Sequence, residues 1–241
     1  MENYIIKLEQ EFKNNKNVEI AMGQKAYMKN RFDFFGLKSP IRKELQNPFL
    51  LKTNLPKKEE LEFVIKSLWK QPEREVQYFA QELLQKYAKQ YEKNDIDLFE
   101  YIITQKSWWD TVDYIASNIL GSYFIKLPDQ RKQYVKKWIA SNNMWLQRSA
   151  ILFQLKYKEN VDTQLLSFSI NSLLGSKEFF INKAIGWSLR QYGKYNPDWV
   201  LDFVEKTALE NLSKREAIRL LNSFQFLLIL FFSFKKVRFQ I

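Results

Sequence analysis

Four residues in this sequence have types and spacings that could act together: an aspartate, an arginine and two tryptophans. Trp109 and Asp113 are four residues apart, so on a helix they share one face. Arg148 follows Trp109 by 39 residues, and Trp187 follows Arg148 by 39 again. In a protein of stacked helical repeats, equal intervals place residues at equivalent positions of successive repeats. The spacing favours one strip of side chains, although two equal intervals also arise by chance.

The chemistry open to such a strip is electrostatic. A fixed carboxylate stabilises positive charge that develops in a transition state, and the faces of tryptophan rings attract cations. The chain contains no Cys and no His, which excludes disulfides, thiol nucleophiles, imidazole bases and the usual zinc sites. We therefore expect a site without a metal or other cofactor, in which a carboxylate, Lys, Tyr or hydroxyl group carries any catalysis.

The elements that must position these residues are helices. With six Gly and six Pro among 241 residues, long helices are favoured over many hairpins, and no useful length alternates with period two. Helical spacing of apolar residues instead recurs in four stretches, at residues 61–69, 76–87, 112–123 and 181–192. The sequence therefore predicts an all-α fold.

Two of these helices predict how the candidate residues are presented. Trp108 continues the inward line of the helix over residues 112–123, which predicts that its ring is buried. Asp110 and Thr111 lie near the start of that helix, which indicates capping residues. Trp187 lies off the apolar stripe of its own helix between two cations, which indicates a surface that contacts a partner.

Loose repeats also run through the chain. Three segments have an early alanine and end with a tyrosine followed closely by a lysine: Arg74–Lys89, Trp145–Asn160 and Phe179–Asn196. Paired helices that recur at about 40 residues are typical of a HEAT-type solenoid, whose concave face is formed by one helix of each pair. Ser213–Glu216 has the pattern of a capping box and predicts that a last helix begins at Ser213.

Charge suggests the kind of partner. Lys and Arg number 38 against 27 Asp and Glu, so the net charge is +11. This surplus favours a polyanion, nucleic acid first and an anionic membrane second, although a lysine-rich soluble protein has the same balance. The first residues lack the layout of a signal peptide, so we expect a cytoplasmic protein, associated with the nucleoid when on DNA.

The last residues differ from the rest. Residues 224–241 are densely apolar and then basic, and the apolar run is far shorter than the ~20 residues that span a bilayer. The segment could cap the last repeat, anchor the protein at a membrane surface, or result from a reading-frame change; we favour an altered C-terminus over an anchor. We thus predict one HEAT-like repeat domain over residues 1–223 and an atypical tail over 224–241.

Four segments closely resemble one known family. They are YMKNRFDFFGLKSPIRKEL, KSWWDTVD, WLQRSAILFQLKYK and SKEFFINKAIGWSLRQYGK, and the resemblance extends from about Ala26 to Leu220. They are similar to the AlkD-type DNA alkylation repair glycosylases. The resemblance implies a right-handed superhelix of HEAT-like repeats with a basic concave face, acting as a monomer on double-stranded DNA that contains alkylated bases.

The resemblance also implies roles for individual residues. Asp113 matches the catalytic carboxylate, Trp109 and Trp187 match the aromatic residues that embrace the deoxyribose of the lesion, and Arg148 matches the arginine that holds the DNA backbone. Further expected DNA contacts are Tyr27, Lys156, Phe179, Phe180, Lys183 and Arg190. The implied reaction is hydrolysis of the N-glycosidic bond of 3-methyladenine, 7-methylguanine or bulkier adducts, without base flipping, in base excision repair. The sequence departs from the family after about Leu221, which puts the last helix in doubt.

Two other interpretations remain open. HEAT repeats are commonly non-catalytic scaffolds that bind DNA or protein, and a fold does not decide function. Asp113 argues against a plain DNA cradle, because a carboxylate facing phosphates gains nothing there. A protein that binds membrane surfaces through its lysines and its aromatic tail is the second alternative.

Overall fold

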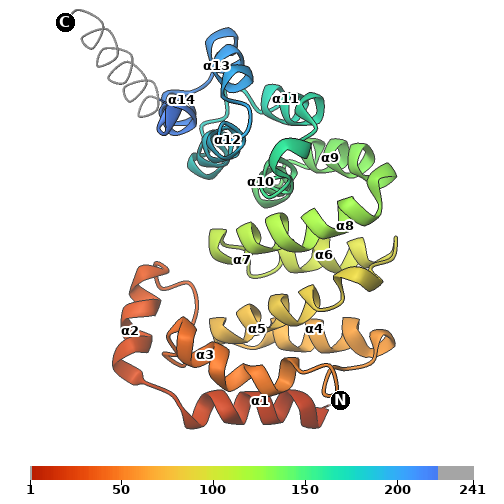
Figure 1. Cartoon of the computed structure of the whole chain (residues 1–241). Coiled ribbons are helices and arrows are strands. Elements are labelled where there is room, and N and C mark those ends of the chain that lie inside the picture. The colour runs from red at the N-terminus through yellow and green to blue at the C-terminus, as the bar shows by residue number, and fades with distance from the viewer. Residues whose placement is uncertain (1, 222–241) are drawn as a thin grey trace, which may run out of the picture. The chain divides into compact units, whose positions relative to one another are not determined.

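The computed structural model describes residues 2–221, and its regular elements are helices (Figure 1). Within that range no strand forms, and one isolated β-bridge joins Asp33 to Glu73. Contacts divide the chain into two compact units, one ending at Leu127 and the other beginning at Pro128. A repeat domain can contain two such units, so the single domain over residues 1–223 stays a prediction. The tail at 224–241 lies outside the described residues.

The described part of the first unit contains eight α-helices. Its helices are α1 (Glu2–Asn14), α2 (Val18–Tyr27), α3 (Ser39–Gln46), α4 (Leu61–Lys70), α5 (Arg74–Gln85), α6 (Asp95–Thr104), α7 (Trp109–Tyr114) and α8 (Gly121–Lys126). A π-helical segment, η4 (Ile115–Leu120), joins α7 to α8, and the 3₁₀ turns are η1 (Asn47–Leu50), η2 (Lys58–Glu60) and η3 (Ala88–Gln90). Helix α4 packs against α5, and α6 packs against η4.

The apolar stripes predicted from the sequence form the core of this unit. The stripes of α4 and α5 and the one from α7 through α8 are buried, with Val64, Phe79 and Val112 fully inaccessible. Burying each such side chain contributes about 1.5–3 kcal/mol, so these faces determine which way each helix is turned. The three predicted helices are confirmed, with the addition of the π-helical segment, which has wider turns than an α-helix.

The prediction of a buried Trp108 is wrong. Helix α7 begins one residue later, and Trp108 is its N-cap in extended backbone, with φ −157° and ψ 161°. The indole is therefore partly exposed, and the guanidinium carbon of Arg31 lies 4.2 Å from the centre of its ring. An extended residue does not continue the periodicity of the helix that follows it. The stripe of buried side chains therefore begins at Val112 and does not include Trp108.

The second unit continues with paired helices. Its helices are α9 (Arg131–Ala140), α10 (Met144–Leu152), α11 (Thr163–Asn171), α12 (Phe179–Tyr192), α13 (Pro197–Lys206) and α14 (Asn211–Ile218), with 3₁₀ turns η5 (Pro128–Gln130) and η6 (Lys158–Asn160). Helix α10 packs against α9 and α12, and α12 packs against α14. The stripe of α12 is buried as predicted.

The capping box predicted at Ser213–Glu216 is wrong. Helix α14 begins at Asn211, and its N-cap Glu210 makes no side-chain cap. Ser213 is buried inside the helix, where its hydroxyl donates to the backbone oxygen of Asn182 at 2.9 Å. The local pattern was that of a cap, but packing against α12 determines what these side chains contact.

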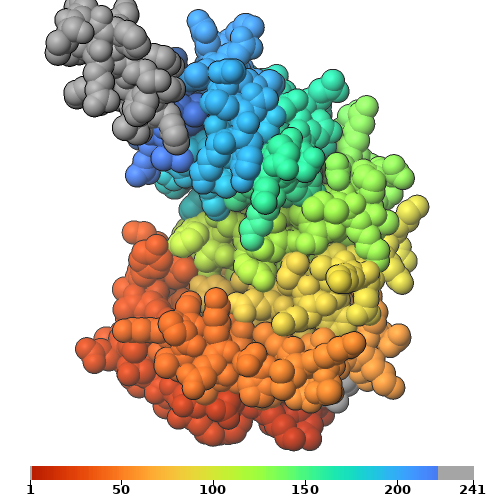
Figure 2. Space-filling model, in the orientation of Figure 1, coloured from red at the N-terminus to blue at the C-terminus, as the bar shows by residue number. Residues whose placement is uncertain are grey.

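The all-α repeat architecture is confirmed within each unit. The three repeat-like segments supply α5, α10 and α12, and α5 and α10 each pack against the preceding helix. Figure 2 shows the same chain with every atom drawn, so that side chains cover the visible face of each unit. The superhelical path and the concave face involve both units and stay predictions. Among residues 2–221 there is no helix with the length and apolarity needed to cross a membrane.

Candidate active site

The first unit brings three of the predicted site residues together at the start of α7. Trp109 is the first residue of this helix and Asp113 lies one turn later, and both side chains are partly exposed. Tyr27 ends α2 and is 70% exposed. Its ring centre lies 6.2 Å from that of Trp109, with the ring planes at 81°. This edge-to-face contact connects α2 to the helix that carries the carboxylate.

A buried ion pair fixes the first turn of α7. Arg74 opens α5 with no exposed side-chain surface and donates from Nε and Nη2 to the two carboxylate oxygens of Asp110, at 2.9 and 2.7 Å. Its guanidinium also donates to the Lys106 carbonyl oxygen at 2.9 Å and to Thr111 Oγ1 at 2.8 Å. The prediction that Asp110 and Thr111 are capping residues is therefore wrong. Both residues take part in the contact between α5 and α7 instead.

Tyr78 completes this network. Its hydroxyl donates to the second oxygen of Asp110 at 2.6 Å. Burial, together with the Asp110 carboxylate, raises the pKa of Tyr78 above its ordinary value. The hydroxyl therefore keeps its proton at neutral pH and remains a hydrogen-bond donor to Asp110.

A second network holds α2, and with it Tyr27. The backbone N–H groups of residues 35–37 donate to the buried carboxylate of Glu75 at 2.9–3.1 Å. Burial raises the pKa of Glu75, and the backbone donors oppose that shift. The N–H of Asn17, the N-cap of α2, donates to the Phe35 oxygen at 2.8 Å. The loop that contains residues 35–37 is thus attached to α5 through Glu75 and to α2 through Asn17.

Gly36 lies where this loop touches α2, and we expect Gly36→Ala to loosen it. Gly36 has φ +90°, and an added Cβ would lie 1.9 Å from the Asn17 oxygen. A strained φ alone costs about 1–3 kcal/mol, and the overlap adds to it. Circular dichroism should show a melting temperature (Tm) lowered by several degrees. The control is Gly23→Ala on α2, where an added Cβ meets nothing within 4 Å. Helix propensity predicts an unchanged or higher Tm there, and equal losses in both variants would contradict the account.

The second unit brings Arg148 together with the aromatic start of α12. Arg148 lies on α10 and is 3% exposed. Its guanidinium donates to the backbone oxygen of Phe180 and lies 5.8 Å from the centre of that ring. Phe180 also contacts Phe179 at 5.4 Å and Trp145 at 5.1 Å between ring centres. Phe179 is 58% exposed, so this cluster presents an aromatic edge to solvent.

Trp187 lies two turns further along α12. It is partly exposed, with Lys183 four residues before it and Arg190 three residues after it, as the sequence predicted. Both cations are held by one acid that the sequence analysis did not identify as part of the site. The carboxylate of Glu216 lies 2.7 Å from the Lys183 ammonium and also pairs with Arg190.

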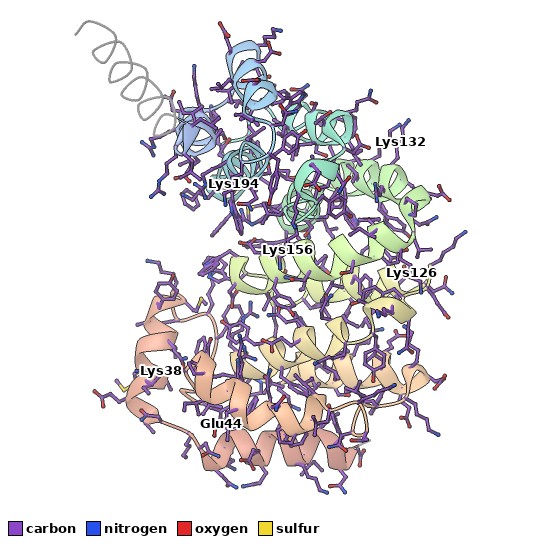
Figure 3. The ribbon with its side chains drawn as sticks, in the orientation of Figure 1. Lys38, Glu44, Lys126, Lys132, Lys156 and Lys194 are labelled. Carbon is purple, nitrogen blue, oxygen red and sulfur yellow. The ribbon has the colours of Figure 1, made fainter. Side chains whose placement is uncertain are left out.

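Both units carry exposed lysines. Lys38 and Lys126 of the first unit and Lys156 and Lys194 of the second are exposed (Figure 3). Lys156, predicted to contact DNA, follows α10 in a turn. Within residues 2–221 no three acidic side chains gather as a metal site would require.

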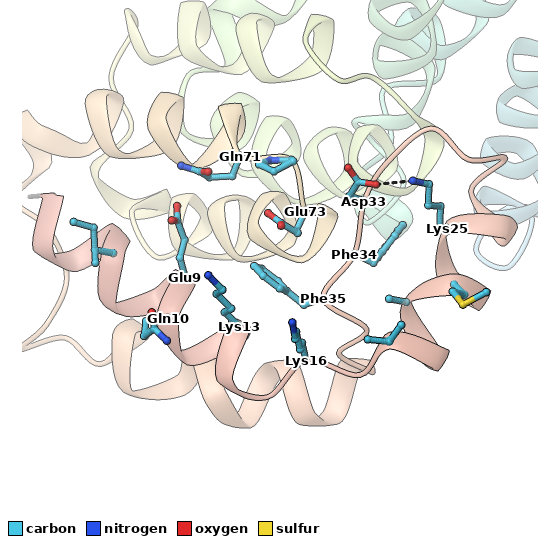
Figure 4. A pocket seen from close by; sticks show the side chains of 15 residues that line it. Glu9, Gln10, Lys13, Lys16, Lys25, Asp33, Phe34, Phe35, Gln71 and Glu73 are labelled. Carbon is cyan, nitrogen blue, oxygen red and sulfur yellow. Dashed lines mark hydrogen bonds and ion pairs between the residues drawn. The ribbon is translucent and has the colours of Figure 1, made fainter.

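Two hollows lie within the first unit. The larger, of about 650 Å³, is bordered by α1, α2 and residues 71–73, and has both acidic and basic walls (Figure 4). There Glu9 and Glu73 face the same space, and burial together with the charge of Glu73 raises the pKa of Glu9. The smaller, of about 240 Å³, lies beside Tyr27. Asp113 and Trp109 line neither of these two hollows, whereas Tyr27 lines the smaller one.

Comparisons with known proteins show the family to which the chain belongs. The family model of the DNA alkylation repair enzymes matches residues 8–221. This chain belongs to that family. A solved structure described as a predicted DNA alkylation repair enzyme from Enterococcus faecalis is 34% identical, with a TM-score of 0.79. The match covers 84% of this chain and 95% of that one. No curated protein matches the chain.

Membership of the DNA alkylation repair enzyme family confirms the resemblance seen in the sequence and gives the protein a role in DNA repair. Family membership also agrees with DNA as the partner of this protein. The family match ends at Leu221, where the sequence analysis also found the departure.

Proposed function

We propose that this protein is a DNA N-glycosylase that removes positively charged alkylated purines from double-stranded DNA. The observation that supports this most is the position of Asp113 beside Trp109 on α7, with Tyr27 against the same indole. Membership of the DNA alkylation repair enzyme family supports a DNA repair role. The substrates proposed are 3-methyladenine, 7-methylguanine and bulkier cationic adducts.

The chemistry suits a site without histidine. Alkylation at N3 or N7 gives the purine a positive charge, so the base leaves as a neutral molecule and needs little help from a general acid. The electron pair of the N-glycosidic bond stays with the base, and positive charge develops on the sugar. Water then adds its oxygen to the anomeric carbon and releases one proton. A carboxylate beside the sugar stabilises that charge and orients the water, as in glycoside hydrolysis.

Each candidate residue has a proposed role in this reaction. Asp113 is the catalytic carboxylate, and Trp109 and Trp187 bind the faces of the deoxyribose. Tryptophan faces contribute about 0.5–2 kcal/mol each to the attraction of a cation. Arg148 holds the DNA backbone at the lesion. Further contacts to DNA are proposed for Tyr27, Lys156, Phe179, Phe180, Lys183 and Arg190.

We further propose that the lesion is processed without extrusion of the base into a pocket. Most enzymes that act on a base enclose it after flipping. The resemblance of the site segments to the AlkD-type glycosylases supports a grip on sugar and backbone instead. Bulky adducts would be tolerated because the base is not enclosed.

The direct test is release of free base. Duplex DNA methylated by a simple alkylating agent is incubated with the purified protein, and free 3-methyladenine and 7-methylguanine are measured by chromatography. Release above that of a protein-free control supports the glycosylase. Binding of the duplex without any release would favour the non-catalytic scaffold.

Trp109→Ala and Trp187→Ala test the aromatic contacts. Because the rings are proposed to stabilise charge that exists only in the transition state, we expect a loss of about tenfold in release for each 1.4 kcal/mol removed. Affinity for undamaged duplex should change much less. Single-turnover release and fluorescence anisotropy give the two values. Parallel losses in both would make the rings part of the scaffold.

A further inference from the structure

The contact between α12 and α14 is unusually close at one position. Gly186 is buried on α12, and a Cβ added to it would lie 2.5 Å from the Cβ of Glu216 and 2.8 Å from the Ser213 oxygen. Only a residue without a side chain allows this approach. Ser213 adds hydrogen bonds to the backbone and side-chain oxygens of Asn182 at 2.9 and 3.1 Å. Helix α14 is thus fixed in register along α12.

The register determines where the Glu216 carboxylate lies. Its Cβ lies over Gly186, and Lys183 and Arg190 are three residues before and four residues after that glycine, on the same face of α12. One carboxylate oxygen lies 2.7 Å from the Lys183 ammonium, and the other pairs with Arg190. Glu216 is 8% exposed, whereas the side chains of Lys183 and Arg190 are 38% and 19% exposed, so a buried carboxylate holds two cations that still reach the surface.

The Glu216 carboxylate keeps its charge further into the acid range than an ordinary glutamate does. Hydrogen bonds from Lys183, together with Arg190, lower the pKa of Glu216. Two cations and one anion leave a net charge of +1 beside Trp187. A fixed arrangement of charges avoids the cost of ordering two long side chains when a ligand binds.

We propose that Glu216 is a positioning residue: it holds Lys183 and Arg190, which lie four residues before and three residues after Trp187 on α12, in the directions from which they would contact the DNA backbone. This inference rests on the proposed glycosylase function. This role connects α14 to the reaction, although no residue of α14 is proposed to contact the sugar. Glu216 acts through the two cations, and Gly186 allows it to reach them.

The first test is Glu216→Gln, which removes the negative charge and keeps the shape of the side chain. We expect single-turnover release of 7-methylguanine to fall by about tenfold to 100-fold, since a displacement of about 1 Å can cost about 100-fold. Affinity for undamaged duplex should rise, with a salt slope steeper by about one, because a net positive charge is gained. Slower release with tighter binding is a combination that simple destabilisation does not produce.

The second test is Gly186→Ala, which keeps every charge and pushes α14 away from α12. Release should again slow, and affinity should not rise. The matched control is Glu210→Gln, which removes a partly exposed acid at the start of α14 that pairs with Lys177 at 2.8 Å. Its release rate should equal that of wild type. Each assay is run well below the Tm of the variant. Should Glu216→Gln not fold, Gly186→Ala is compared with wild type at equal folded fraction by circular dichroism: slower release by the folded variant supports the positioning role, and release at the wild-type rate overturns it.

Wild-type release at saturating enzyme separates the two levels of the proposal. If the wild-type protein releases no base, the glycosylase proposal fails. If wild type releases base and both Glu216→Gln and Gly186→Ala release it at the same rate, the positioning role is overturned while the glycosylase stands.

Discussion

Replacing Asp113 by Asn should abolish most base release and leave DNA binding intact. The substitution keeps the size and most of the polarity of the side chain and removes its negative charge. Loss of one preorganised electrostatic partner of a transition state costs about 100-fold to 1000-fold in rate, or about 3–4 kcal/mol. Affinity for undamaged duplex should stay equal or rise, because a carboxylate near phosphates opposes binding. Single-turnover release of 7-methylguanine and anisotropy titrations measure the two effects.

The matched control for Asp113→Asn is Glu62→Gln. Glu62 lies on α4 of the same unit and forms an exposed pair with Lys66. This variant removes the same charge without touching α7, so its release rate should match that of wild type. Wild-type release by Asp113→Asn would refute the catalytic role, and equal losses in both variants would trace the effect to net charge.

The second large effect is expected at Asp110, which contacts no substrate in this proposal. Asp110→Asn leaves the guanidinium of Arg74 buried without its counter-charge. Breaking a buried pair from one side typically costs about 3–5 kcal/mol. For a chain of this size that corresponds to a fall in Tm of roughly 6–20 °C. Thermal unfolding followed by circular dichroism measures it, and release should slow below the transition because Trp109 and Asp113 share the turn that Asp110 anchors.

Two companion variants test this explanation. Arg74→Met combined with Asp110→Leu removes both charges, and apolar replacements of buried pairs are often neutral, so the double variant should recover much of the lost Tm. Asp202→Asn breaks the exposed pair with Lys206 on α13 and should leave Tm unchanged. A double variant less stable than Asp110→Asn would show that the pair itself stabilises the fold.

The helices could be predicted from the sequence because burial imposes a period. The stripes of α4, α5 and α12 consist of side chains whose spacing alone shows which face is buried. The same reasoning placed Asp113 and Trp109 on one face of one helix. It also found Trp187 between two cations, since residues three and four apart are neighbours on any helix.

The partners of these residues could not be predicted in the same way. Asp110 is a helix-start residue in the local pattern, yet its carboxylate binds Arg74, 36 residues earlier. Glu216 fits a capping box, yet it binds two cations of another helix. Local patterns report what a side chain can do within its own turn, whereas pairing between helices depends on how closely two backbones approach. The unusual closeness at Gly186 has no periodic signal.

The π-helical segment η4 has a consequence for how the chain tolerates length changes. A π-helical turn accommodates one more residue than an α-helical turn, and an α-helix rotates by about 100° per residue. Deleting one residue within 115–120 would let the segment close into a regular helix while the stripe beyond it stays buried. Six π-helical residues turn through about the same angle as five α-helical ones, so Trp109 and Asp113 would keep their direction in such a variant. Deleting one residue from α7 itself, where no wide turn absorbs the change, would instead rotate the groups before it by about 100° and turn them away from the site.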